Sequence, residues 1–366
     1  MMVDANTIAN SSTFKTPKEA WLYEKSEEQA VICNLCAHHC YIPSGQVGVC
    51  KVRENRAGRL YTLVYDRILS LNIDPVEKKP FFHFLPSTLA YSMATAGCNF
   101  HCRFCQNWEI SQMPRDHKGV ILGEKIPPRE IVRRALSARC ATVAYTYTEP
   151  TIFFELAYDT ARLASEAGLR NIFVTNGYMT KEALRMIQPY LDAANIDLKG
   201  FDDKRYRRIC GAKLQPVLDS IGLTKQLGIW LEVTTLLIPG HNDSNEELRQ
   251  MALFLKDIGP EIPWHLSAFF PAYKMMDAAP TDRETLLRAW HIGKDAGLRY
   301  VYCGNLPILF HQDTKCYRCG KTLIQRRGFY VEANLLAHGR CPFCQTPIDG
   351  VWDNGNPSVV TALPPH

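Results

Sequence analysis

The stretch CNFHCRFC, residues 98–105, follows directly on an apolar run with the composition of a β-strand. Its cysteines, Cys98, Cys102 and Cys105, therefore share one loop at the end of a strand, and an aromatic residue precedes the last of them. Three thiolates fill three of the four ligand positions of a 4Fe-4S cluster and leave one iron open to bind another molecule. A zinc loop or three unrelated thiols are the alternatives. The strand, the spacing and the aromatic residue together favour the open cluster.

The sequence from about residue 89 to residue 305 alternates short β-branched or aromatic runs with longer amphipathic stretches, which is typical of repeated βα units and a parallel sheet. The predicted strands cover residues 89–96, 141–147, 171–175, 194–198, 229–237 and 265–269, with residues 299–303 as a candidate seventh. The predicted helices cover residues 128–138, 151–167, 181–191, 214–227, 244–257 and 283–296. Six or seven units are too few for a closed eight-stranded barrel, so we expect an α/β fold with an open or partial barrel of the (β/α)6 type. Its site should lie at the C-terminal ends of the strands.

The composition argues against some classes of protein. A chain of 366 residues, 46% of them hydrophobic, can bury one large core and still carry a smaller module at either end. The 42 basic and 37 acidic residues leave a formal charge of +5 without a long basic run, so charge alone does not indicate nucleic-acid binding. Residues 1–12 do not resemble a secretory signal, and no apolar run approaches the roughly 20 residues that cross a bilayer. We therefore expect a cytoplasmic protein without a membrane span.

The chain has fourteen cysteines and no export signal, so its thiols are expected to be reduced and to bind metal more often than they pair. Cys140, Cys210 and Cys303 stand apart from the others and are predicted to be buried apolar thiols. Besides the 98–105 loop, the cysteines form an N-terminal and a C-terminal group, which are Cys33, Cys36, Cys40 and Cys50, and Cys316, Cys319, Cys341 and Cys344.

Both outer groups are predicted to hold metal. The two Cys-x2-Cys knuckles of the C-terminal group favour zinc in a tetrahedron of thiolates, with rubredoxin-like iron as the alternative. The N-terminal group is less regular, and His38 and His39 lie among its cysteines as replacement ligands, so zinc and a second iron–sulfur cluster both stay open. We divide the chain into a tail or helix (1–28), a cysteine-containing module (29–85), the partial barrel (86–305) and a zinc-ribbon-like or rubredoxin-like module with a tail (306–366).

The cluster loop resembles that of the radical S-adenosylmethionine (SAM) superfamily. In this superfamily SAM binds the open iron through its amino and carboxylate groups, and an electron from the cluster breaks the sulfonium to give a 5'-deoxyadenosyl radical. The resemblance therefore implies an enzyme with a 4Fe-4S cluster at Cys98, Cys102 and Cys105, SAM as a second cofactor and an external electron donor.

The ends of the predicted strands carry segments that resemble the SAM-binding motifs of the same superfamily. Glu149, in Tyr147-Thr148-Glu149-Pro150, is the candidate for the SAM amino group, although an acidic residue before Pro150 also suits a helix start. The SAM contacts that the resemblance implies are Phe104, Thr148, Glu149, Asn176, Asp197, Lys199 and Ile238.

The remaining SAM segments each have a structural alternative. Thr175-Asn176-Gly177 and Asp197-Leu198-Lys199 match segments of the glycyl-radical activases, but Asp197 and Lys199 could also pair with neighbours. Leu237-Ile238-Pro239-Gly240 resembles the backbone stretch that flanks adenine and could equally be a plain turn.

Over nearly its whole length the chain resembles a narrower family, the radical SAM member of the AmmeMemoRadiSam system, which is similar to pyruvate formate-lyase activating enzyme in its barrel. The resemblance rests on CNLC (33–36), GQVGVC (45–50), DPVEKKP (74–80), GCNF (97–100), CQNW (105–108) and YVYCGN (300–305). It implies a Memo-like and an AMMECR-type companion protein but no particular substrate. Residues 78–83 suit either a docking or substrate edge or a solvated turn.

Three functions follow from these patterns. The leading hypothesis is a radical SAM enzyme that modifies an unidentified small molecule, nucleobase or protein side chain. The alternatives are a glycyl-radical-enzyme activase and a non-catalytic zinc-ribbon protein that binds nucleic acid, which would have no use for an open three-cysteine site. Because the outer cysteine groups flank the barrel instead of following the cluster loop, we expect that the protein does not install a glycyl radical.

Overall fold

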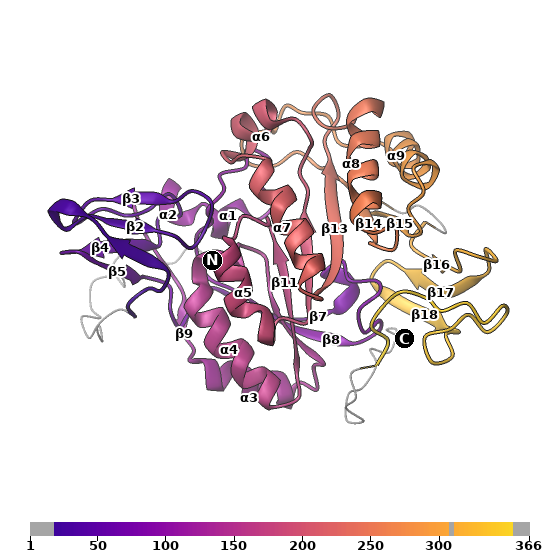
Figure 1. Cartoon of the computed structure of the whole chain (residues 1–366), viewed down its shortest axis with the longest axis horizontal. Coiled ribbons are helices and arrows are strands. Elements are labelled where there is room, and N and C mark those ends of the chain that lie inside the picture. Colours follow the sequence, from indigo (N-terminus) through magenta and orange to yellow (C-terminus); the bar gives the residue numbers. More distant parts are fainter. Residues whose placement is uncertain (1–17, 307–310, 354–366) are drawn as a thin grey trace, which may run out of the picture.

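Within residues 18–306 and 311–353, which the computed structural model describes, the core is an eight-stranded sheet with the order β15-β14-β13-β12-β11-β10-β8-β7 (Figure 1). Strands β8 and β10 to β15 run parallel, and β7 pairs antiparallel with β8 at one edge. The strands are β7 (Ser70–Pro75), β8 (Leu89–Ala94), β10 (Thr142–Tyr145), β11 (Arg170–Thr175), β12 (Ala193–Asp197), β13 (Trp230–Leu237), β14 (Trp264–Ala268) and β15 (Val301–Gly304).

The predicted parallel α/β sheet is confirmed, including the candidate seventh strand. Strand β7 was not predicted, and it comes from the segment that we assigned to the N-terminal module. Its side chains alternate poorly between buried and exposed, and it ends on Pro75, which suits an edge strand because proline cannot donate to a further ladder. The main sheet therefore includes one strand that hydrophobic periodicity does not reveal.

Helices precede or connect the parallel strands at the predicted positions, and they lie largely on one side of the sheet in Figure 1. Thr180, Ser244 and Asp282 begin three of them by accepting a hydrogen bond from a backbone N–H of the first turn. These helices are α3 (Pro128–Ser137), α4 (Phe154–Glu166), α5 (Lys181–Ile187), α7 (Gln215–Gln226), α8 (Asn245–Ile258) and α9 (Arg283–Asp295).

Several shorter helices lie in the connections between these elements. Helix α6 (Asp203–Cys210) was not predicted; Asp202 caps its first turn, and Gly211 ends it in the left-handed conformation. The other short helices are α1 (Trp108–Ser111), α2 (Met113–Asp116), and the 3-10 helices η2 (Glu27–Gln29), η3 (Val76–Lys78), η4 (Pro150–Phe153) and η5 (Gln188–Tyr190).

The N-terminal cysteines lie in small antiparallel sheets that pack against the main sheet's helices. A buried ion pair between Arg53 and Glu155 of α4, 2.8 Å long, joins the two parts. The strands are β1 (Tyr23–Lys25), β2 (Val31–Cys33) and β3 (Cys40–Ile42) in one sheet, β4 (Arg53–Arg56) with β5 (Arg59–Thr62), and β6 (Arg67–Ile68) with β9 (Glu124–Lys125).

The C-terminal cysteines lie in the loops between and after the strands of a three-stranded antiparallel sheet, at the opposite end of the molecule from the N-terminal module (Figure 1). Its strands are β16 (Thr314–Lys315), β17 (Thr322–Arg327) and β18 (Tyr330–Asn334). A separate apolar cluster joins this sheet to Phe82, Tyr300 and Tyr302 of the main body, and Arg326 donates to the Phe82 carbonyl oxygen at 2.7 Å.

The structure contradicts the solvated turn over residues 78–83, because Lys79, Phe81 and His83 are buried. Lys78 and Lys79 instead line the cavity described below, where a substrate edge would lie. Within the described residues, no helix is long and apolar enough to cross a membrane.

Candidate active site

A cavity of about 400 Å3 lies at the C-terminal ends of the parallel strands, a size typical of small-molecule sites. All but one of the residues predicted for the cluster and for SAM line it, namely Cys98, Cys102, Phe104, Cys105, Thr148, Glu149, Asn176, Asp197 and Lys199. Ile238 is not among them; it lines a smaller adjoining pocket together with Phe104 and Lys199. The structure therefore places residues from one loop and several strand ends around one space.

The cluster loop is held by close backbone packing on both sides. Gly97 has a φ of +101°, and a Cβ there would lie 2.7 Å from a methyl carbon of Val52, so only glycine fits. At the other side, the backbone N–H of His101 donates to the Cys210 carbonyl oxygen at 3.1 Å, at the end of α6. The added Cβ of a side chain at Gly211 would lie 1.9 Å from the His101 ring. Both glycines let the loop fit between the N-terminal module and α6.

The three thiols are buried or half-buried and fit a metal cluster. Burial raises the pKa of Cys98 and Cys105, and a hydrogen bond with the Cys210 thiol, followed by burial, raises that of Cys102. Such thiols become thiolates most readily when a metal cation binds them. Cys140, Cys210 and Cys303 are buried as predicted, but Cys210 touches a cluster cysteine, which no local motif indicated.

Glu149 lies in the cavity wall, and its two carboxylate oxygens accept different numbers of hydrogen bonds. One oxygen, Oε1, accepts hydrogen bonds from the Thr151 backbone N–H at 3.0 Å, the Thr151 hydroxyl at 2.5 Å and the Thr175 hydroxyl at 2.7 Å. The other, Oε2, accepts from the Asn176 backbone N–H at 2.8 Å and from no other donor in the described part of the chain. Burial raises the pKa of Glu149, and the hydrogen bonds partly offset it. Glu149 thus both caps η4 and keeps one acceptor position open at Oε2.

The other predicted SAM contacts have partners within the chain. Lys199 and Asp197 form an ion pair with each other at 2.7 Å. This is the pairing with a neighbour that the sequence left open as an alternative for both residues. Asn176 donates from its side-chain amide to the Asn99 side-chain oxygen at 2.7 Å, beside Cys98. The Thr148 hydroxyl donates to the Thr95 carbonyl oxygen at 3.0 Å.

A charged cluster that the sequence did not assign to the site also lines the cavity. The buried Lys79 ammonium lies 2.7 Å from Asp74 and 3.9 Å from the ring centroid of Tyr147, whose hydroxyl donates to Asp74. Burial lowers the pKa of Lys79 to about 8. Burial would raise the pKa of Asp74, but hydrogen bonds from Lys78, Lys79 and Tyr147 outweigh it and hold that pKa below its usual range. The DPVEKKP motif was the available signal for this cluster.

The C-terminal cysteines form a compact group. The Sγ atoms of Cys316 and Cys344 are 3.6 Å apart, and those of Cys319 and Cys341 are 3.7 Å apart. All four sulfurs lie within 4.8 Å of one another. A tetrahedron with zinc–sulfur bonds of about 2.3 Å has edges of about 3.8 Å, so this group is already close to the geometry of a single-ion site.

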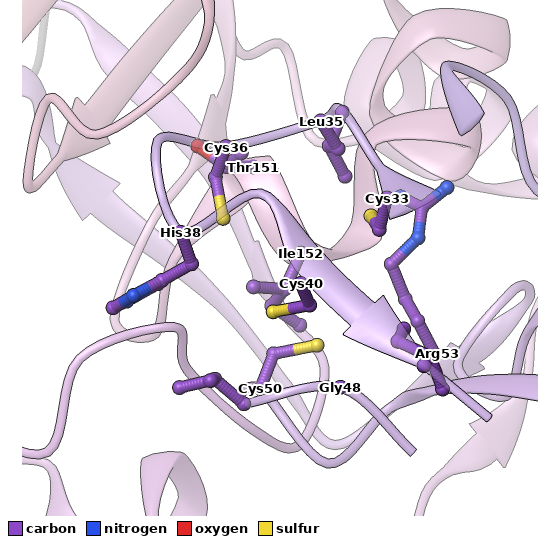
Figure 2. Close-up of a pocket in the computed structure, with 12 residues that line it drawn as sticks. Cys33, Leu35, Cys36, His38, Cys40, Gly48, Cys50, Arg53, Thr151 and Ile152 are labelled. Atoms are coloured by element: carbon purple, nitrogen blue, oxygen red, sulfur yellow. The ribbon is translucent and has the colours of Figure 1, made fainter. Parts of the chain in front are cut away.

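The N-terminal cysteines surround a small cavity (Figure 2). Cys33 and Cys40 face each other across the β2–β3 ladder, while Cys36 and Cys50 come from the flanking loops. His38 also lines the cavity, and its Nε2 donates to the Asn99 carbonyl oxygen at 2.8 Å. His39 is not among the lining residues; its ring contacts the Asn34 side-chain oxygen at 3.0 Å.

Comparison with known proteins is consistent with this geometry. A family model described as the radical SAM superfamily matches residues 93–255. An uncharacterised protein of Methanocaldococcus jannaschii is 45% identical over 335 residues, which are 91% of this chain and 99% of that protein.

More distant similarities include proteins with described activities. A pyruvate formate-lyase-activating enzyme of Clostridium pasteurianum is 22% identical over 168 residues, 44% of this chain and 67% of that enzyme. A crystal structure of a radical SAM methyltransferase from Sphaerobacter thermophilus aligns with a TM-score of 0.47 and 17% identity, over 61% of this chain and 68% of that one.

Proposed function

Because this chain belongs to the radical SAM superfamily, we propose that it binds a 4Fe-4S cluster at Cys98, Cys102 and Cys105, binds SAM in the cavity beside them, and starts a radical reaction on a substrate held there. When bound, these cofactors supply a 5'-deoxyadenosyl radical through one-electron cleavage of SAM. The observation that carries the proposal is that one cavity unites the three thiols of a single loop with polar side chains from several strand ends.

Glu149 is proposed to bind the SAM amino group. Its Oε2 has one internal donor and room for another, and an ionised carboxylate accepts a strong hydrogen bond from an ammonium. The three bonds at Oε1 hold the carboxylate in one orientation, so it needs no rearrangement to bind.

Lys199 is proposed to bind an anionic group of SAM or of the substrate. Its ammonium has three donors, and Asp197 is the partner for one of them. Burial would lower the pKa of Lys199, but Asp197 outweighs it and raises that pKa, so the side chain stays charged. Asp197 thus keeps the cation in place while its other donors remain usable.

The test is anaerobic reconstitution with iron and sulfide, reduction with dithionite, and measurement of 5'-deoxyadenosine formed from SAM. We expect turnover by the wild type and its loss in the Cys102→Ala variant. The Cys140→Ala variant is the matched control, because that thiol is equally buried but does not line the cavity, and it should keep turnover. Absence of 5'-deoxyadenosine from wild-type protein with a full cluster complement would refute the proposal.

The substrate is proposed to be a small molecule, a nucleobase or a protein side chain, and glycyl-radical activation is the second candidate. The similarity to a pyruvate formate-lyase-activating enzyme favours that candidate. Membership in an enzyme superfamily argues against the non-catalytic nucleic-acid-binding alternative. Incubating reduced enzyme and SAM with a glycyl radical enzyme of the same cell should give no glycine-centred doublet in electron paramagnetic resonance (EPR). A doublet with stoichiometric 5'-deoxyadenosine would favour the activase.

The flanking parts are proposed to support this reaction. The compact sulfur geometry of Cys316, Cys319, Cys341 and Cys344 supports a zinc-ribbon-like site at the C-terminal end. We further propose that the parallel sheet and its helices form a partial (β/α)6-type barrel, and that the chain divides into four parts after residues 28, 85 and 305. We also propose that the protein is cytoplasmic and that it binds Memo-like and AMMECR-type companion proteins. Co-purification of the chain with those two proteins would test the last point.

A further inference from the structure

The N-terminal module contains a buried arginine that lacks partners for part of its hydrogen-bonding capacity. Only 2% of the Arg53 surface is exposed, and its Nη2 donates at 2.8 Å to both Glu155 and the Trp21 carbonyl oxygen. Its Nε and Nη1 are buried and have no hydrogen-bond partner among the residues that the structure describes. Leaving charged donors buried and unsatisfied is costly, so these N–H groups indicate a missing acceptor.

The unpartnered donors belong to a side chain that lines the cysteine cavity. Arg53 lies in its wall with Cys33, Cys36, Cys40 and Cys50, and Figure 2 shows the guanidinium beside Cys33. A metal bound by four thiolates carries net negative charge, and its sulfur atoms accept N–H hydrogen bonds. Such a centre would provide the acceptor that the protein chain lacks.

The spacing of the sulfurs indicates which kind of centre fits. Among the cysteines of the described residues, only those of the C-terminal group lie within 4.8 Å of one another in sets of three or more. The N-terminal four do not, and neither do Cys98, Cys102 and Cys105, which are proposed above to hold a 4Fe-4S cluster. A cluster separates its thiolates by several metal and sulfide atoms, whereas one ion draws them together. The N-terminal group therefore resembles the cluster set.

This cavity also adjoins the active-site cavity. Thr151 lines the cysteine cavity, and both its backbone N–H and its hydroxyl donate to Glu149, which lines the other. The carbonyl oxygen of Cys50 lies 3.2 Å from where a Cβ of Gly97 would be, directly before Cys98. The two cysteine groups are thus separated by little more than one layer of backbone.

We propose that Cys33, Cys36, Cys40 and Cys50 hold a second 4Fe-4S cluster, next to the first, and that Arg53 donates hydrogen bonds to it through Nε and Nη1. The inference goes beyond the proposed function and does not depend on SAM cleavage. Arg53 is a positioning and charge-compensating residue here, since Glu155 already holds it through Nη2.

The first test removes the active-site cluster. The Cys98→Ala/Cys102→Ala/Cys105→Ala variant is reconstituted anaerobically, and its iron, sulfide and zinc are measured together with its EPR spectrum after dithionite reduction. We expect half of the wild-type iron and the spectrum of one reduced cluster. Complete loss of iron, or a second equivalent of zinc in its place, would overturn the proposal. Wild-type protein that keeps all its iron but forms no 5'-deoxyadenosine would refute the proposed function alone.

The second test changes the arginine within that triple variant. Arg53→Lys keeps the positive charge but cannot reproduce both N–H directions, so the EPR g-values and the midpoint potential should shift. Arg326→Lys is the matched control, because Arg326 is also buried with an unpartnered Nε but lies in the C-terminal module. Glu155→Gln removes the ion pair and spares the Arg53 donors, so it should leave the spectrum unchanged. A spectrum of Arg53→Lys identical to that of Arg326→Lys would refute the role of Arg53.

Discussion

The Glu149→Gln substitution distinguishes two roles of this carboxylate, the capping of η4 and the proposed binding of the SAM amino group. Glu149 is 1% exposed, and glutamine can keep its oxygen at the Oε1 position with all three donors. The amide nitrogen then replaces Oε2 and loses the bond from the Asn176 N–H, a bond to a charged group worth about 1.5–3 kcal/mol. Because burial raises the pKa of Glu149, removing its charge also removes a desolvation cost. We therefore expect the free energy of unfolding to fall by less than about 1.5 kcal/mol.

The same substitution should reduce the free energy of SAM binding more than the free energy of unfolding. Loss of a charged acceptor for the SAM ammonium costs about 2 kcal/mol, which corresponds to roughly 30-fold weaker binding. Anaerobic isothermal titration calorimetry on reconstituted protein measures this, and iron content should not change. The wild-type affinity should also fall as the pH is lowered through the raised pKa of Glu149, because the protonated carboxyl no longer accepts, whereas the variant should lack this dependence.

Thr175→Val is the matched control for this experiment. It removes one donor to Oε1 and leaves the carboxylate charge, so it should cost about 1 kcal/mol of stability and change the SAM affinity by less than about threefold. If Glu149→Gln instead lost several kcal/mol of stability and kept its SAM affinity, Glu149 would serve only to begin η4, and its proposed contact with SAM would be wrong.

Two further changes test other parts of the chain. Cys341→Ser should lower bound zinc from one equivalent to none by elemental analysis, while Cys140→Ser keeps it; retention of zinc in the first variant would contradict the four-thiolate site. Lys79→Met should lower the free energy of unfolding by about 2 kcal/mol in urea, because it removes a buried partner of Asp74 that Lys78 and Tyr147 replace only in part. Lys78 is half-exposed, so Lys78→Met should lower the free energy of unfolding by less than about 0.5 kcal/mol. Equal losses for the two variants would contradict the argument that burial makes the Lys79–Asp74 ion pair the more important one for stability.

Short-range spacing was enough to predict the parallel sheet and the loop geometry. Cys98, Cys102 and Cys105 lie within eight residues of chain after one strand. Thr148 and Asn176 each follow another strand, and Asp197 ends a further one. Parallel strands all finish at one edge of a sheet, so identifying the strands brings these residues together. The structure places them around one cavity, and their roles as ligands stay predictions.

Burial and long-range contact could not be predicted in the same way. Arg53 meets Glu155 across 102 positions of sequence, and no local pattern marks either residue as buried. The same holds for Cys210 beside Cys102, for Lys79 in the cavity wall and for β7 at the sheet edge. Whether a charged or polar side chain is buried depends on the segments that pack over it, and those segments come from distant parts of the chain. Local sequence therefore determined which chemical groups stand at the strand ends, and only tertiary packing decided which other charges and thiols surround them.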